Sequence, residues 1–184
     1  MSAIRLKVKK AEGKHDLGTS KFLGSPTLPE EMVNEFNGNV LFLLQINLEE
    51  IKDLDKENRL PHHGYLYVFL DTTDDYNLVP IVRYYDGEPT CVVGDFNSTV
   101  PEFEQFVDEW LISFSECEDS ETGNKLFGCP ADWNYQEEPR ELFLQFDPLD
   151  SEMGLFDYFD GLLYLFYAEG SKKLEDITAE WEIS

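Results

Sequence analysis

A short phrase occurs twice in the chain and constrains its fold more than any other feature. Residues 21–26 read KFLGSP, and residues 125–130 read KLFGCP. Two further segments recur in the same order: LLQIN at 43–47 with FLQFD at 143–147, and GYLYVF at 64–69 with GLLYLF at 161–166. The offset is about 100 residues each time, so the spacing indicates a tandem internal duplication.

Each copy reads as a tight Gly-x-Pro turn, a buried strand and a second strand that opens with glycine. One such unit would expose an apolar face, and two units can bury those faces against each other. We therefore predict a mainly β (α+β) fold, a mostly antiparallel sheet with one or two short helices. Residues 1–184 would form a single domain, with halves at about 20–98 and 124–184.

The strand predictions rest on two patterns. Residues 4–9 alternate apolar and basic side chains, as in a half-buried strand. Residues 39–47 are apolar almost throughout, as in a strand buried on both faces. Residues 77–86 also predict a strand, which Pro80 pushes toward an edge or a bulge. The remaining predicted strands are 64–71, 90–95, 141–147, 161–168 and 176–183.

Two segments favour helix. In residues 99–116 the apolar side chains recur at the spacing of one helical face, after a Thr99–Glu102 capping box. This segment would join the two halves. Residues 27–38 offer a second capping box, Thr27 with Glu30, and predict a short helix.

Charge limits the classes of partner. The net charge is −24, from 38 acidic and 14 basic residues, and such a field repels nucleic acids and anionic membranes. It favours a basic protein partner, although solubility alone also explains it. The odd count of three cysteines fits a reduced chain, and the first ten residues lack the apolar stretch of a signal peptide. We expect a cytoplasmic protein.

No motif for a metal, cofactor or catalytic group stands out. The acidic run at 53–57 lacks the glycine and the final glutamate of a calcium loop. His62 and His63 are adjacent and have no ligand spacing with any cysteine. No nucleophile elbow or phosphate-binding loop occurs. We expect no cofactor and no metal.

Two glutamines interrupt apolar runs and attract attention. A buried amide needs partners, and Gln45 and Gln145 would each tie down a neighbouring loop, such as the Gly-x-Pro turn of their own half. Alternatively they face a cleft at the seam between the halves. That second interpretation makes the seam the candidate binding site, formed by Gln45, Asn47, Gln145, Asp147 and Asp160.

Tyrosines lie in or beside the predicted strands; they are Tyr65, Tyr67, Tyr84, Tyr85, Tyr158, Tyr164 and Tyr167. Most would be core or sheet-face residues. A minority beside acidic residues would suit lysine- or arginine-rich partners, through charge and cation–π contacts.

From Ser20 to its end the sequence resembles the YwqG-like family, a domain of unknown function (DUF1963). The segments that carry the resemblance are SKFLGSPTLP (20–29), LFLLQINLEEI (41–51), KLFGCP (125–130), LFLQFD (142–147) and GLLYLFY (161–167). Family members carry a Trp-Gly-Asp-x-Gly turn before the last of these strands, of which only Gly161 is kept here. The resemblance implies a mainly β, rolled and duplicated sheet and carries over no catalytic residue.

Two functions stay open. Some relatives are encoded beside bacterial toxin systems, so the resemblance implies a toxin-immunity or other binding role. With the charge and the tyrosines, this favours a non-catalytic module that recognises a basic protein. The alternative is an enzyme of unrecognised type with its site at the seam, which predicts a concave seam lined by titratable side chains.

Overall fold

The structure is a computed structural model that describes residues 3–36, 39–74, 78–99, 106–131, 140–149, 153, 155 and 161–183. Its strands are β1 (Ala3–Lys10), β2 (Lys21–Phe22), β3 (Thr27–Leu28), β4 (Val40–Asn47), β5 (Tyr65–Asp71), β6 (Val79–Tyr85), β7 (Cys91–Val92), β8 (Trp110–Cys117), β9 (Lys125–Leu126), β10 (Leu142–Phe146), β11 (Gly161–Phe166) and β12 (Thr178–Ile183). The helices of the described residues are short 3-10 turns, η1 (Glu30–Met32), η2 (Leu48–Glu50), η3 (Asn97–Thr99) and η6 (Leu174–Asp176).

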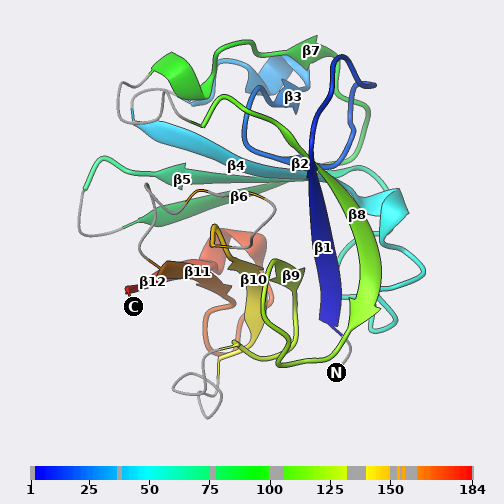
Figure 1. Ribbon diagram of the computed structural model, residues 1–184, viewed down its shortest axis with the longest axis vertical. Coiled ribbons are helices and arrows are strands. Elements are labelled where there is room, and N and C mark those ends of the chain that lie inside the picture. The colour runs from blue at the N-terminus through cyan, green and yellow to red at the C-terminus, as the bar shows by residue number, and fades with distance from the viewer. Residues whose placement is uncertain are drawn as a thin grey trace.

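Ten of the strands form one antiparallel sheet that curls into a nearly closed, barrel-like shape (Figure 1). Their order is β12-β11-β10-β9-β1-β8-β2-β4-β5-β6, and β3 pairs with β7 in a separate ribbon. The two edge strands, β6 and β12, contact each other, and η6 also contacts β6. The prediction of a mainly β, rolled and antiparallel sheet is therefore confirmed.

In the centre of the sheet, the N-terminal strand β1 pairs with two strands that are distant from it in the sequence, β8 and β9. β1 pairs along its whole length with β8, from Ala3 opposite Cys117 to Lys10 opposite Trp110. On its other side β1 pairs with β9, while β8 pairs with β2. The N-terminal strand thus belongs to the part of the sheet built by the C-terminal residues.

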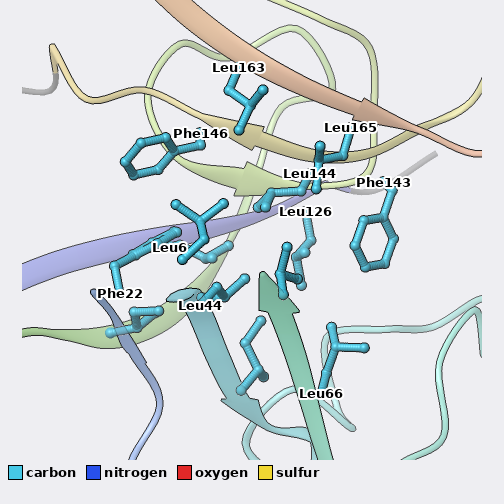
Figure 2. Packing of buried hydrophobic residues seen from close by; sticks show 14 of the residues in the cluster. Leu6, Phe22, Leu44, Leu66, Leu126, Phe143, Leu144, Phe146, Leu163 and Leu165 are labelled. Carbon is cyan, nitrogen blue, oxygen red and sulfur yellow. The ribbon is translucent and has the colours of Figure 1, made fainter. Parts of the chain in front are cut away.

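The main core fills the inside of the curled sheet (Figure 2). Alternate residues of β4, β5, β10 and β11 point inward, and the rings of Phe22 and Phe146 meet there with centroids 5.2 Å apart. The residues between them point outward and are buried as well, as Phe42 and Phe69 are under η1 and the 93–97 segment. Burial on both faces explains why these strands read as unbroken apolar runs.

The predicted helix over 99–116 is wrong where the structure describes it. Residues 110–117 form β8, and residues 106–108 form a turn. Trp110 and Ile112 point into the core, which is the two-residue period of a strand. Pairing with all eight residues of β1 outweighs the helical spacing of the apolar side chains. Residues 100–105 lie outside the described residues.

The predicted helix over 27–38 is also wrong. Thr27 and Leu28 form β3, and only Glu30–Met32 turn as a 3-10 helix, with Pro29 at its N-cap. Thr27 cannot cap a helix because its hydroxyl and backbone N–H both bond to the Gln45 side chain. Residues 37 and 38 lie outside the described residues.

Candidate functional site

The two Gly-x-Pro turns are built alike, and the lysine that opens each is buried. Leu23 and Gly24 have positive φ angles of 58° and 73°, and Phe127 and Gly128 have 64° and 83°. Lys21 Nζ donates to the Ser25 carbonyl at 2.6 Å. Its counterpart, Lys125, donates in the same way to the turn that follows it.

The two glutamines tie these turns to the sheet. Gln45 Oε1 accepts from the Thr27 N–H at 2.9 Å, and its Nε2 donates to the Thr19 carbonyl at 2.8 Å. Gln145 Oε1 accepts from the Ala131 N–H at 2.8 Å, and its Nε2 donates to the Gly123 carbonyl at 2.7 Å. Both side chains are fully buried, so the loop-tying interpretation accounts for their contacts.

Asn47 and Asp147 occupy matching positions at the ends of β4 and β10. The Asn47 N–H donates to Ser20 Oγ, and the Asp147 N–H donates to Asn124 Oδ1, both at 2.9 Å. Each side-chain oxygen caps the following backbone, at Glu49 and at Leu149 respectively. Asp160 lies outside the described residues. As a binding site, the predicted set of five residues stays a prediction.

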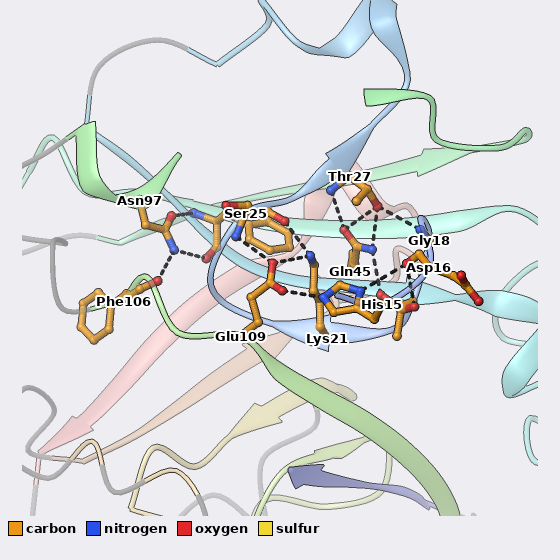
Figure 3. A network of polar contacts seen from close by, with 12 residues as sticks. His15, Asp16, Gly18, Lys21, Ser25, Thr27, Gln45, Asn97, Phe106 and Glu109 are labelled. Atoms are coloured by element: carbon orange, nitrogen blue, oxygen red, sulfur yellow. Dashed lines mark hydrogen bonds and ion pairs between the residues drawn. The ribbon is translucent and has the colours of Figure 1, made fainter. Parts of the chain in front are cut away.

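A charged cluster surrounds the first turn (Figure 3). Glu109, which immediately precedes β8, accepts from Lys21 Nζ at 2.6 Å through Oε1. Its Oε2 lies 2.5 Å from His15 Nε2, and His15 Nδ1 lies 3.2 Å from the Asp16 carbonyl. Each ring nitrogen thus faces an oxygen, the Glu109 carboxylate on one side and the Asp16 carbonyl on the other. We call Lys21, Glu109 and His15 the turn cluster.

Burial and pairing act on the pKa values of the turn cluster in opposite directions. Burial lowers the pKa of Lys21, and the hydrogen bond and charge of Glu109 oppose that change. For Glu109, burial alone would raise the pKa. The hydrogen bonds and charges of Lys21 and His15 outweigh it, and the pKa of Glu109 falls below its ordinary value. The cluster therefore holds an ionised carboxylate at neutral pH.

The turn cluster opens onto a hollow of about 370 Å³. Its walls come from residues 13–17, Thr27, Val92 and the cluster itself. Leu17 and Val92 are 49% and 59% exposed. They are two of only four large apolar residues that are exposed in the described part of the chain, and they line the same hollow. We call this the Leu17–Val92 hollow.

Beside this hollow, Tyr65 and Tyr85 contact the carboxylates of Glu88 and Glu31 respectively, and we call these four residues the tyrosine–carboxylate face. Tyr65 donates its hydroxyl to the exposed Glu88 carboxylate at 2.7 Å. Burial, followed by Glu88, raises the pKa of Tyr65. Burial and the Glu31 carboxylate raise the pKa of the partly buried Tyr85. A Cβ placed on Gly18 would lie 2.5 Å from the Tyr65 hydroxyl, so this tyrosine–carboxylate face adjoins the hollow at residue 18.

The other tyrosines of the sequence prediction have mixed locations. Tyr67 and Tyr164 are fully buried against the outer side of the sheet, and Tyr84 is partly buried. Tyr167 lies in the main core. Tyr158 lies outside the described residues. The expected minority, an exposed aromatic surface with acidic neighbours, is represented only by the partly buried Tyr84, beside Asp86, and Tyr85, beside Glu31, because Tyr65 is buried.

The interior between the two halves is filled by apolar side chains (Figure 2), but a second hollow of about 380 Å³ lies on the surface. Residues 57–59 form one side, and Glu141, Tyr167 and Lys172 form the other. The Arg59 guanidinium stacks 4.2 Å from the centroid of the Phe127 ring. Burial raises the pKa of Tyr167 to about 12, with the Arg59 charge acting in the opposite direction.

No group of three or more His, Cys, Asp or Glu side chains that could hold a metal ion occurs among the described residues. The buried Asp55 accepts from the Leu60 N–H at 2.9 Å, and His62 lies 3.5 Å from it, while His63 lies 3.1 Å from Asp86. The cysteines are free thiols. Within the described ranges, no helix has the length and apolar character needed to cross a membrane.

Sequence reasoning missed the turn cluster. The predicted helix over 99–116 includes Glu109, and His15 and Glu109 stand 94 positions apart in the sequence. One signal was available: a lysine opens both copies of the repeated phrase, at 21 and 125. A lysine that recurs beside apolar residues indicates a buried ammonium group, which then requires acceptors.

Comparison with known proteins finds a family match for the first part of the chain. Residues 20–93 match the family model described as a domain of unknown function, DUF1963. This match confirms the resemblance over those residues, which include the first turn, Gln45 and the tyrosine–carboxylate face. No curated protein matches the chain.

Proposed function

We propose that this protein is a non-catalytic binding module that recognises a basic protein. The observation that carries the proposal is the tyrosine–carboxylate face. Its exposed carboxylates attract lysine and arginine side chains, and the partly exposed ring of Tyr85 can add a cation–π contact. Tyr65, which is only 4% exposed, contributes by holding Glu88 through its hydroxyl.

Three carboxylates converge near Tyr65, since Glu88, Glu49 and Glu50 all act on its pKa. Tyr85 brings Glu31 to the same side of β5 and β6, because Tyr65 lies opposite Tyr85 in the sheet. The net charge of −24 would steer a basic partner toward the molecule from a distance. A toxin is one such partner, by analogy with the gene context of the family.

Affinity capture with paired variants tests this function. The immobilised protein is exposed to a lysate at about 20 mM and about 300 mM salt, a range over which screening becomes strong. We expect captured proteins to be basic and to be released at the higher salt. The variant Glu31→Gln with Glu88→Gln should lose most of the captured protein.

The matched control is Glu169→Gln with Glu175→Gln, which removes the same charge from exposed positions in the second half. It should retain the capture. Equal losses in the two variants would show that net charge alone attracts the bound proteins. Capture of nothing at the lower salt would refute the proposed function.

We further propose that the sheet arose by tandem duplication. Its strand order supports this, since three long strands and a two-residue strand flank the β1–β8 pair on each side. The paired contacts of Gln45 and Gln145 support it too, as does the register shift that interrupts both β4 and β10. An experimental structure whose two halves fail to superpose would refute the duplication.

An enzyme remains the second candidate, and one observation favours it. The hollow at Tyr167 lies between residues of the two halves and holds a tyrosine with a raised pKa, as an active-site hypothesis requires. A thermal-shift screen of small anions tests it. Stabilisation that disappears in Tyr167→Phe would support this site, and a screen with no response would remove it.

A further inference from the structure

The two Gly-x-Pro turns differ in one respect: the first carries the turn cluster, and the second has no counterpart of Glu109 among the residues that the structure describes. At the second turn, the Lys125 ammonium donates to three backbone carbonyls, those of Asp119, Glu121 and Cys129, at 2.6–2.7 Å. At the first turn, Glu109 replaces two of these acceptors for Lys21. Backbone carbonyls alone therefore suffice to build a Gly-x-Pro turn around a buried lysine.

The group that lies over each turn differs accordingly. A Cβ placed on Gly24 would meet Glu109 Cγ at 2.2 Å, whereas one placed on Gly128 would meet the Asp119 carbonyl oxygen at 2.5 Å. The backbone of Asp119 thus occupies, at the second turn, the place that the glutamate side chain takes at the first. The carboxylate and its histidine are features of the first turn only, and they lie at the surface hollow rather than in the core.

The effect of the turn cluster is to hold the loop that carries Leu17. His15 is fixed by Glu109, and the Asp16 carbonyl accepts from Thr19 Oγ1 at 2.7 Å. The Gly18 N–H donates to Thr27 Oγ1 at 3.2 Å. Leu17 therefore stays exposed on an anchored loop, where an apolar side chain contributes contact area at little cost in ordering.

We propose that the Leu17–Val92 hollow is the docking point for an apolar side chain that is flanked by lysine or arginine in the basic partner. The inference rests on the proposed function and locates its contact. Leu17 and Val92 supply the apolar contact. The exposed carboxylates of Asp16, in the hollow, and Glu88, on the adjoining face, complement the flanking cations, whereas the exposed Lys14, which also lines the hollow, opposes them.

Apolar residues beside complementary charges are the usual composition of an interface centre and its rim. Val79 and Val107 are exposed to a similar degree, 48% and 49%, and neither lines the Leu17–Val92 hollow. They provide matched controls for any loss of exposed apolar surface.

Two synthetic peptides test the docking point: repeated Lys-Leu-Lys-Gly units, and the same units with serine in place of leucine. Their charge is equal, so the ratio of their affinities isolates the apolar contact. We expect the leucine peptide to bind at least about fivefold more tightly. The ratio should approach one in Leu17→Ser with Val92→Ser and stay unchanged in Val79→Ser with Val107→Ser.

A ratio near one for the unmodified protein, or equal ratios in the two double variants, would overturn the docking point. Salt-sensitive binding of both peptides with no preference for leucine would refute only this location and leave the proposed function standing. Failure of both peptides to bind at about 20 mM salt would instead count against the proposed function itself.

His15 is a positioning residue in this scheme, and a double-mutant cycle separates that role from a structural one. His15→Ala should reduce the preference for the leucine peptide in the unmodified background. In the Leu17→Ser background it should have no further effect on that preference, because the side chain that it positions is gone. Equal effects in both backgrounds would refute the positioning role.

Discussion

Replacing Gln45 by leucine tests whether its amide holds the first turn. The substitution keeps a similar volume but leaves the Thr27 N–H and the Thr19 carbonyl without the bonds of 2.9 and 2.8 Å that they make to the amide. An unsatisfied buried polar group costs about 1–3 kcal/mol. Two such groups therefore cost about 2–6 kcal/mol, of which the more apolar leucine returns about 1 kcal/mol.

We expect the free energy of unfolding of Gln45→Leu to fall by about 1–5 kcal/mol, measured by urea titration at an unchanged m-value. In a chain of this length, that corresponds to a decrease in Tm of about 2–20 °C. Gln145→Leu should behave alike, since its amide bonds to Ala131 and Gly123 in the same way.

Asn34→Leu is the matched control, because it replaces an exposed amide by leucine. Its effect should stay within about 0.5 kcal/mol. A loss below about 0.5 kcal/mol for Gln45→Leu as well would refute the reasoning. If such a variant also lost binding to a partner, the amide would belong to a binding site rather than to the scaffold.

Three further outcomes are expected. Lys125→Met strands three carbonyl oxygens and should cost about 3 kcal/mol or more in urea unfolding, whereas replacing the exposed Lys173 by methionine should change little. The pKa of Glu109 is lowered, so its stabilising effect is complete above the ordinary glutamate pKa near 4.5 and declines as the pH falls through the lower pKa of the folded state. Glu109→Gln should flatten this decline in acid-unfolding curves. Parallel curves for the variant and the unmodified protein would contradict it. Asn97 bonds to the backbone of Phe42 and Phe106, and Asn97→Ala should destabilise the protein by about 2–4 kcal/mol in thermal unfolding.

The sequence predicted the strands well where both faces are buried, since residues 40–47 and 65–71 have apolar side chains in almost every position. The helix predicted over 99–116 is wrong at residues 110–117, which form the strand β8. Their strand is stabilised by pairing with β1, about 100 residues away, and a local window does not contain that partner.

The candidate site was predicted only in part. The bonds from Gln45 and Gln145 to the turns follow from one rule, that a buried amide must find partners near it. The turn cluster brings together His15, Lys21 and Glu109, whose meeting depends on how β8 lies beside β2. That arrangement is a property of the curled sheet and leaves no periodicity in the sequence.

The pairing of β1 with strands that come much later in the sequence has a consequence for synthesis of the protein. β1 leaves the ribosome about 100 residues before its neighbours β8 and β9, which lie at residues 110–126. Its apolar side chains, such as Leu6, are covered only after those strands have been made. During that interval the lysines that alternate with them, such as Lys7, would keep the nascent strand from pairing with other chains.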